Sequence, residues 1–409
     1  MASLSDKLKS LGVKVGARDL PPPRPRAEVY AVEQLLPGYF QPTSRGEIFV
    51  VEKLYSPEYR HGRAGLQISA SLHTVARWAN ERRIASAEPA AMAFLDTETT
   101  GLAGGTGTYA FLIGVGRFEG EQFRLAQFFM RDPAEEPAQL AALSDFLAPG
   151  EILVTFNGKA FDAPLLNARY ITNGQASPLT RLAHLDLLPL ARRLWRDRLP
   201  SRALGQLEVH ILGAGRTQED VPGWLIPTIY FDYLRSGDAR PLQGIFYHNA
   251  MDILAMAALL NHMAQLLADP LDGQVEHGLD LVAIARLLED LGQLEQAAHL
   301  YRHGLSRDLP EEHYWDTLER LALMFKRQGD WPAAVELWQQ AAAGRQIYAH
   351  IELAKFHEHQ ARDYSQAAYW TETALTIINA PNYPRAARRQ WRSELEHRLA
   401  RLQRKLKKL

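Results

Sequence analysis

The sequence of 409 residues contains no cysteine. This absence excludes disulfide bonds, thiolate-bound zinc, iron–sulfur clusters and thiol nucleophiles, and it favours a cytoplasmic protein. A large excess of one charge is also lacking, because the net charge is −1 at pH 7. Any affinity for nucleic acid must therefore come from local basic patches. The N-terminus lacks the apolar core of a signal peptide, and no run approaches transmembrane length, so we expect no association with a membrane.

The remaining composition is that of a globular protein, with 46% hydrophobic and 23% charged residues. This length is sufficient for two or three domains. Strand-like apolar runs lie near residues 91–95, 109–116, 122–130 and 152–156. Helical patterns separate or follow them, among them residues 185–195, roughly 203–212 and 245–267. The order of these segments predicts a mixed sheet covered by helices.

Two acids, Asp96 and Glu98, follow the first of these apolar runs. On an extended backbone, residues i and i+2 point to the same face, so both carboxylates project together. Like charges held side by side repel and are costly to desolvate, and oxygen ligands favour Mg²⁺ or Mn²⁺. The pair therefore predicts a site for a divalent cation. The alternative is a polar strand end that faces water.

Two more segments supply acids that fit the same site. Asp162 follows the strand at residues 152–156 and lies near the start of a helix, where it is either a metal ligand or an N-cap. His248 and Asp252 are four residues apart and share one face of a helix. Beside three other carboxylates, this pair predicts a metal ligand with a general base one turn away.

The last third of the sequence contains an internal repeat. Its marker is a turn followed by an alanine pair, which begins at Ala297 and recurs after 36 and then 34 residues. This period is similar to that of tetratricopeptide repeats. The final segment, residues 385–409, carries ten lysines and arginines against two glutamates and predicts a basic capping helix.

In combination, Asp96, Glu98, Asp162, His248 and Asp252 resemble the DEDD superfamily of 3′–5′ exonucleases, which have an RNase H-like fold. With the repeats, the chain is similar to the bacterial YprB (mitomycin repair factor B-like) family. The resemblance implies an α/β RNase H-like domain followed by an all-α tetratricopeptide-like domain. The domain boundaries that we expect are 1–26 for an N-terminal segment with a Pro-rich linker, 27–90 for an extension on or near the catalytic domain, 91–270 for the exonuclease domain, and 275–409 for the repeats and capping helix.

The resemblance also implies a two-metal mechanism with Mg²⁺ or Mn²⁺. Asp96 would bridge both ions, Glu98 and Asp252 would hold one, Asp162 would hold or orient the other, and His248 would be the general base. His248 has three residues between itself and Asp252, a spacing typical of the tyrosine branch of the superfamily. Tyr247 is therefore the alternative base, although i and i+4 geometry favours His248. The implied substrate-binding residues are Thr99, Thr100, Gly101, Leu102, Asn157 and Lys159.

Some charged residues have two open interpretations. Asp186 is either a fifth acid near the site or a helix N-cap. Lys159 and the arginines between residues 192 and 198 either line a path for phosphates or form an exposed helix face.

The function implied by the resemblance is a metal-dependent 3′–5′ exonuclease in DNA repair. Its expected partners are nucleic acid, with DNA expected rather than RNA, and a helicase or other protein bound by the repeats. The alternatives are an exoribonuclease and a catalytically silent nucleic-acid-binding scaffold.

Overall fold

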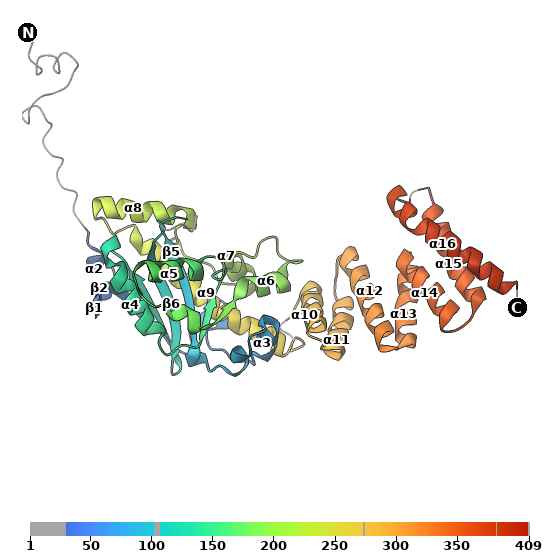
Figure 1. Ribbon diagram of the computed structural model, residues 1–409, viewed down its shortest axis with the longest axis horizontal. Coiled ribbons are helices and arrows are strands. Elements are labelled where there is room, and N and C mark those ends of the chain that lie inside the picture. The colour runs from blue at the N-terminus through green and yellow to red at the C-terminus, as the bar shows by residue number, and fades with distance from the viewer. Residues whose placement is uncertain (1–29, 102–106, 273–274, 382, 408–409) are drawn as a thin grey trace, which may run out of the picture. The chain divides into compact units, whose positions relative to one another are not determined.

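The computed structural model describes residues 30–101, 107–272, 275–381 and 383–407 (Figure 1). The chain divides into two compact units that alternate along the sequence. The first unit holds the described residues up to Gln67, with Ala87–Asp186 and Glu208–Leu259. The second holds Ile68–Ser86, Leu187–Leu207 and Leu260–Leu409, as far as these are described.

The first unit contains a mixed sheet of seven strands in the order β1-β2-β7-β6-β5-β8-β9. Strand β5 lies between β6, to which it is antiparallel, and β8, to which it is parallel. The strands of this sheet are β1 (Gly38–Thr43), β2 (Gly46–Tyr55), β5 (Met92–Thr99), β6 (Ala110–Glu119), β7 (Gln122–Phe129), β8 (Ile152–Thr155) and β9 (Ala183–Asp186). A separate hairpin pairs β3 (Arg60–His61) with β4 (Ala64–Gly65).

Helices cover both faces of the sheet (Figure 1). On one face, Ala93 and Leu95 of β5 pack in a cluster with residues of α4 (Glu136–Leu147) and α5 (Asp162–Thr172). On the other face, Leu112 of β6 belongs to a cluster with residues of α8 (Ile226–Ser236) and α9 (Leu242–Ala268). Because side chains alternate along a strand, Asp96 and Glu98 lie on the face of α8 and α9. The expected mixed sheet covered by helices is confirmed.

Short elements complete the first unit. They are α2 (Val32–Leu35), the 3₁₀ turns Pro89–Ala91, Pro133–Glu135, Pro178–Arg181 and Gly223–Leu225, and the π turn Glu208–Leu212.

Helix α9 approaches the sheet closely because β6 presents glycine beneath it. A Cβ atom at Gly114 would lie 2.1 Å from Oδ1 of Asn249, and one at Gly116 would lie 2.6 Å from Cγ2 of Ile253. Both glycines thus leave the space that the α9 side chains fill. The helix has 27 residues and is apolar enough to cross a membrane by length and composition alone. The expectation that no run approaches transmembrane length was therefore wrong, although 83% of the apolar stretch is buried inside the protein, as in a core helix.

The second unit is helical in its described residues. It contains α3 (His73–Ala79), the 3₁₀ turn Arg82–Ser86, α6 (Leu187–Trp195), α7 (Leu204–Leu207), α10 (Gly278–Asp290), α11 (Leu294–Leu305), α12 (Glu311–Gln328), α13 (Trp331–Ala343), α14 (Ile347–His359), α15 (Tyr364–Asn379) and α16 (Arg385–Leu406). From α10 to α16, each helix packs against the next (Figure 1).

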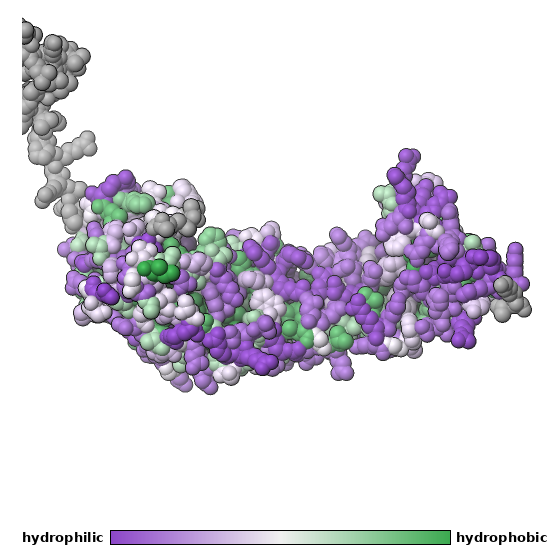
Figure 2. All heavy atoms as spheres, in the orientation of Figure 1, coloured by the Kyte–Doolittle hydropathy of each residue, from purple (hydrophilic) through white to green (hydrophobic). Residues whose placement is uncertain are grey.

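The three copies of the sequence repeat all fall at a turn between two helices, α10–α11, α12–α13 and α14–α15. In the second and third copies an aspartate, Asp330 or Asp363, caps the following helix. Ala297, Ala334 and Ala367 are fully buried. Small side chains at these positions allow neighbouring helices to approach closely. The surface of this part is mostly hydrophilic in the view of Figure 2.

Helix α16 covers the preceding pair. Leu395 packs in a cluster with residues of α14 and α15, and Leu402 packs against Ala367 and Ala368. Glu358 of α14 has a buried carboxylate that accepts hydrogen bonds from three residues of α16, namely Arg398, Arg401 and Lys405. Part of the basic charge of this helix is thus neutralised inside the protein.

Two secondary-structure expectations require correction. Residues 185–195 were expected to be one helix, but residues up to Asp186 form β9 and the helix begins at Leu187. Residues 203–212 form a short helix followed by a π turn, not one continuous α-helix.

Candidate functional site

The first two acids lie inside β5, not at its end. Asp96 pairs with Gly114 of β6, and the register shifts between Glu98 and Thr99. A bulge of this kind bends a strand and redirects its side chains. Glu98 is 8% exposed, so its carboxylate is largely removed from water.

Asp162 comes to the same end of β5 from the opposite face of the sheet. It is the first residue of α5, whose N-cap is Phe161, so the N-cap interpretation of Asp162 is wrong. Its Oδ1 accepts a hydrogen bond of 2.5 Å from the hydroxyl of Thr97, the residue between the two β5 acids. Burial raises the pKa of Asp162 to about 6, against the effect of this hydrogen bond.

Helix α9 contributes the last two residues. Nε2 of His248 lies 3.6 Å from Oδ2 of Asp252, as expected for residues one turn apart. Nδ1 of His248 lies 2.7 Å from Oδ1 of Asp220. A carboxylate at Nδ1 fixes the ring and favours the tautomer in which Nε2 is free to accept a proton.

The four carboxylates act on one another electrostatically. Burial raises the pKa of Asp96 well above its usual value, and Asp252, Glu98 and Asp162 raise it further. Burial likewise raises the pKa of Glu98, with additional repulsion from Asp252 and Asp162. Buried like charges repel in this way when no cation separates them. The structure therefore brings together the four acids that the sequence singled out.

An arginine absent from the sequence analysis enters this cluster. Arg216 donates hydrogen bonds to Asp252 and, through Nε at 2.7 Å, to Glu208. Glu208 is buried and also contacts Nε2 of His61 at 2.7 Å. Burial alone would lower the pKa of Arg216, but Asp252 and Glu208 outweigh it and keep the guanidinium charged. The only sequence signal was a cluster of charges in a glycine-containing segment, residues 213–220.

Asn249 is a second residue that the sequence analysis missed. It is fully buried, and its Nδ2 donates to Oδ2 of Asp96 at 2.9 Å. Its Oδ1 accepts from Nε2 of Gln127 at 3.0 Å. This hydrogen-bonded chain fixes the orientation of Asp96. An amide next to His248 in a largely apolar segment was the available signal.

The donor chemistry of the cluster suits a hard divalent cation, because it consists of buried carboxylate oxygens that repel one another. The positions of these side chains differ from those of ligands around a bound metal ion. Among the described residues, no group of three or more His, Cys, Asp or Glu side chains is arranged to hold a metal ion. Instead, Asp96, Asp162 and Asp252 each bind a protein group, namely Asn249, Thr97 and Arg216.

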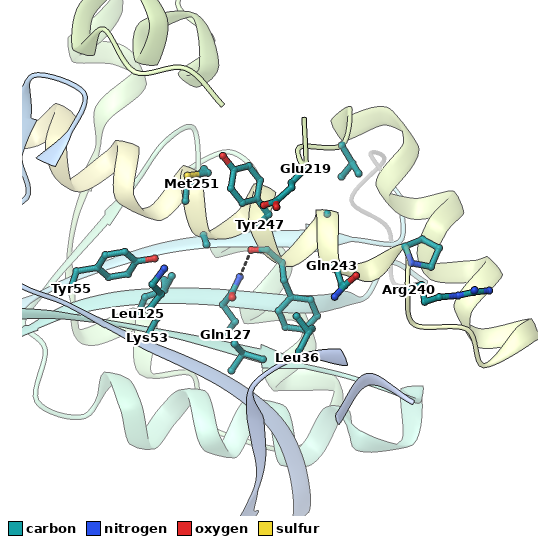
Figure 3. A pocket seen from close by; sticks show the side chains of 16 residues that line it. Leu36, Lys53, Tyr55, Leu125, Gln127, Glu219, Arg240, Gln243, Tyr247 and Met251 are labelled. Carbon is teal, nitrogen blue, oxygen red and sulfur yellow. Dashed lines mark hydrogen bonds between the residues drawn. The ribbon is translucent and has the colours of Figure 1, made fainter. Parts of the chain in front are cut away.

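Tyr247, the alternative base, lines a different space. It borders a cavity of about 670 Å³ together with residues of β2, β7 and α9, among them Lys53, Tyr55 and Met251 (Figure 3). Its hydroxyl accepts a hydrogen bond of 3.0 Å from the backbone N–H of Thr217. The geometry thus favours His248 over Tyr247 as the residue beside Asp252.

The predicted substrate-binding residues divide between two loops. After β5, the hydroxyl of Thr99 donates to the carbonyl of Gly101, and Oγ1 of Thr100 accepts from the N–H of Tyr109. Leu102 lies outside the described residues.

After β8, the backbone N–H groups of Asn157 and Lys159 donate to the carboxylate of Asp186, at 2.7 and 3.2 Å. Asp186 ends β9 and raises the pKa of Asp162 through its charge. Asp186 therefore acts as a nearby fifth acid, and its position directly before Leu187 is also that of a helix N-cap.

Comparison with known proteins gives the class of this site. Residues 93–264 match the family model of the RNase H superfamily. The first unit therefore contains an RNase H-like domain, which supports a nuclease role on a nucleic acid substrate. Nucleases of this superfamily generally use divalent metal ions.

The chain is also 32% identical over 290 residues to the uncharacterised protein YprB of Bacillus subtilis (strain 168), a match that covers 69% of this chain and 68% of YprB. The chain belongs to the YprB family. A solved structure of the family B DNA polymerase from Pyrobaculum calidifontis is similar over 49% of this chain, with 15% identity and a TM-score of 0.31. The chain spans 29% of that polymerase.

Proposed function

We propose that this protein is a metal-dependent 3′–5′ exonuclease of the DEDD type that hydrolyses DNA and participates in DNA repair. The observation that carries the proposal is the mutual repulsion of Asp96, Glu98, Asp162 and Asp252, which come from three elements of an RNase H-like domain. Burying four carboxylates together is costly, and a divalent cation would remove that cost.

Two ions, Mg²⁺ or Mn²⁺, would be held by the carboxylates of Asp96, Glu98, Asp162 and Asp252. When bound, such ions stabilise the attacking and the leaving oxygen of a phosphodiester in an in-line displacement. The residues of the chain supply the remaining chemistry. His248 accepts a proton from the attacking water at Nε2, while Asp220 holds Nδ1. Asn249 keeps Asp96 oriented through its hydrogen bond to Oδ2.

Substrate would be gripped by the two loops that follow β5 and β8. Thr99, Thr100 and Gly101 would grip the terminal nucleotide, and so would Leu102, which lies outside the described residues. Asn157 and Lys159 would contact its phosphate. The side chain of Lys159 is exposed, so its ammonium is free to reach an anion.

We propose for the second unit that residues 275–409 form tetratricopeptide-like repeats that dock a helicase or another protein partner. Their helix pairs at a period of about 34 residues support this assignment. We propose domain boundaries at 1–26, 27–90, 91–270 and 275–409. We also propose a cytoplasmic location.

A specific observation favours a second candidate, a catalytically silent nucleic-acid-binding scaffold. The guanidinium of Arg216 is bonded to the carboxylate of Asp252. Among the described residues, no group of three or more His, Cys, Asp or Glu side chains is arranged to hold a metal ion. In this alternative, the guanidinium permanently takes the place of a metal ion.

A labelled-strand assay separates the candidates. DNA and RNA strands carrying a label at either end are incubated with Mg²⁺ or Mn²⁺ and either wild type or Asp96→Asn. We expect the wild type to remove a 3′ label first, from DNA faster than from RNA, and Asp96→Asn to be inactive. Faster loss from RNA indicates an exoribonuclease. No metal-dependent cleavage of any strand contradicts the nuclease proposal and supports the scaffold.

A further inference from the structure

The second unit contains a cavity of about 360 Å³ whose lining is rich in arginine. Its wall is built from sequence segments that lie far apart, namely α3, α6 with the residues after it, and α10. Helix α6 packs against α10 within this unit. The residues that matter here are Trp78, Arg192, Arg193, Arg196, Arg202 and Arg286.

The positive charge of this cavity is only partly neutralised. Asp197 is the single acid among the described residues that line it. Arg286 donates to Asp197 at 3.1 Å and to Asp316 at 2.6 Å, and Arg193 pairs with Asp290. Five guanidinium groups thus share three carboxylates, which leaves an excess of positive charge around one small space.

Several guanidinium donors have no partner. Arg192 makes no hydrogen bond or ion pair with any described residue, and Arg196 has only a contact of 3.4 Å with its neighbour Asp197. The Nε atoms of Arg202 and Arg286 are buried and make no hydrogen bond in the described part of the chain. A buried N–H without an acceptor is costly, so an added acceptor would be stabilising.

Some buried arginines elsewhere in the chain have both sides of the guanidinium fork engaged by a carboxylate. Arg169, for example, forms two hydrogen bonds of 2.6 Å with the buried carboxylate of Glu136. Arginine forks match phosphate as well as carboxylate. The exposed guanidinium groups of Arg192 and Arg196 therefore suit an oxyanion that is not part of the chain.

Trp78 adds an aromatic surface to this group of cations. It is partly exposed, and within the described ranges its ring has no stacked, edge-on or cation–π partner. A free aromatic face beside arginines is the arrangement that proteins use for single strands, where bases stack and phosphates meet cations. A duplex would keep its bases stacked on one another and could not use the ring.

We propose that this cavity binds a single-stranded nucleic acid, with phosphates on the arginines and one base stacked on Trp78. The choice of nucleic acid among polyanions rests on the proposed nuclease function. The cavity shares no residue with the proposed nuclease site, since none of the four acids or His248 lines it.

The test is fluorescence anisotropy of a labelled oligothymidylate with the full-length protein in EDTA, where no metal-dependent cleavage occurs. We expect Arg192→Glu/Arg196→Glu to weaken binding about tenfold or more. A plot of log affinity against log salt concentration should also become less steep, its slope decreasing in magnitude by about 1.4, since two phosphate contacts are lost. Both arginines have exposed side chains, so their replacement should leave the fold intact.

Trp78→Ala should weaken binding about tenfold and Trp78→Phe much less, because stacking needs a ring. The matched control is Arg307→Glu/Arg327→Glu, which changes the net charge equally at exposed positions of the repeats. Wild-type affinity in this control, together with losses in the cavity variants, supports the proposal.

Three outcomes would overturn the proposal. They are no binding by the wild type, equal losses in the cavity and control variants, and competition by polyglutamate as strong as by unlabelled oligothymidylate at equal charge. Because the assay contains no metal, a failure of nuclease activity would leave these results unchanged. The two proposals can therefore fail separately.

Discussion

The guanidinium of Arg216 bonds to the carboxylate of Asp252 and, through Nε, to the buried carboxylate of Glu208. A cation that belongs to the chain therefore lies among acids that would otherwise only repel one another. Any divalent ion that uses Asp252 must compete with this guanidinium.

Removing Arg216 should therefore strengthen metal binding. We expect Arg216→Gln to bind Mn²⁺ about fivefold or more tightly than the wild type, because a unit charge within a few ångströms is worth roughly 1 kcal/mol or more. Isothermal titration calorimetry measures the affinity. The control is Arg235→Gln, which removes an exposed arginine paired with Asp232. Unchanged or weaker Mn²⁺ binding by Arg216→Gln would show that the arginine and the ion do not compete.

The contacts of His248 and Tyr247 predict opposite effects of mutation. His248→Ala should slow cleavage by about 10²- to 10⁴-fold, since it removes the group placed to accept a proton. Tyr247→Phe should stay close to the wild-type rate because Tyr247 lines a different cavity. Asp220→Asn should have an intermediate effect, because Asp220 holds Nδ1 of the ring and does not itself accept the proton of the water.

Single-turnover rates with a 3′-labelled strand measure these effects. Mn²⁺ affinity serves as the control and should be the same in His248→Ala and the wild type. A crippled Tyr247→Phe beside an active His248→Ala would assign the base to the tyrosine.

Gly114 is expected to be essential for the position of Asn249. A Cβ at residue 114 would lie 2.1 Å from Oδ1 and 2.8 Å from Cγ of that amide. Gly114→Ala should lower the free energy of unfolding by about 1–3 kcal/mol through overpacking, and cleavage should slow because Asn249 orients Asp96. Urea unfolding measures the first effect. Gly223→Ala is the control, since no atom lies within 4 Å of its added Cβ, and equal stability of the two variants would contradict this account.

Glu358 predicts a pH dependence of the helical unit. Burial alone would raise its pKa, but hydrogen bonds from Arg401 and Lys405 outweigh it and hold the pKa at about 2, below the usual 4.5. The folded state thus prefers the ionised form, so the stabilisation is full above pH 4.5 and is lost as the pH falls toward 2.

We expect Glu358→Gln to lower the free energy of unfolding by about 3 kcal/mol at pH 7, because the buried Arg398 and the partly buried Arg401 and Lys405 lose this carboxylate. The difference from the wild type should shrink as the pH falls below 4.5. Thermal unfolding followed by circular dichroism at several pH values measures it. Glu372→Gln on α15 is an exposed control. A constant difference across this range would mean that the charge of Glu358 does not stabilise the fold.

Much of the sheet could be predicted from the sequence, because β5, β6, β7 and β8 are apolar runs bounded by turn residues. Strand β9 was missed since its apolar residues continue without a break into the leucines of α6. Edge strand β1 was missed because it contains Pro42 and begins at a glycine. Local pattern cannot separate two elements that share one apolar run.

The site shows the same division. The four acids and His248 could be named because each lies in a recognisable local motif. Arg216 and Asn249 could not, since their partners in the site are 36 and 153 residues away in the sequence. Only the folded chain reveals that a cation and an amide complete the acidic cluster.

The central claim is that the four carboxylates form a metal-dependent nuclease site, and the most direct test is the rate of nucleotide release from a single DNA strand. Wild type, Asp96→Asn and Asp162→Asn are compared with Mg²⁺, with Mn²⁺ and with EDTA. The expected result is release by the wild type only with a divalent ion, and a rate at least about 10³-fold lower for both variants. Equal release by wild type and variants, or release in EDTA, would contradict the account.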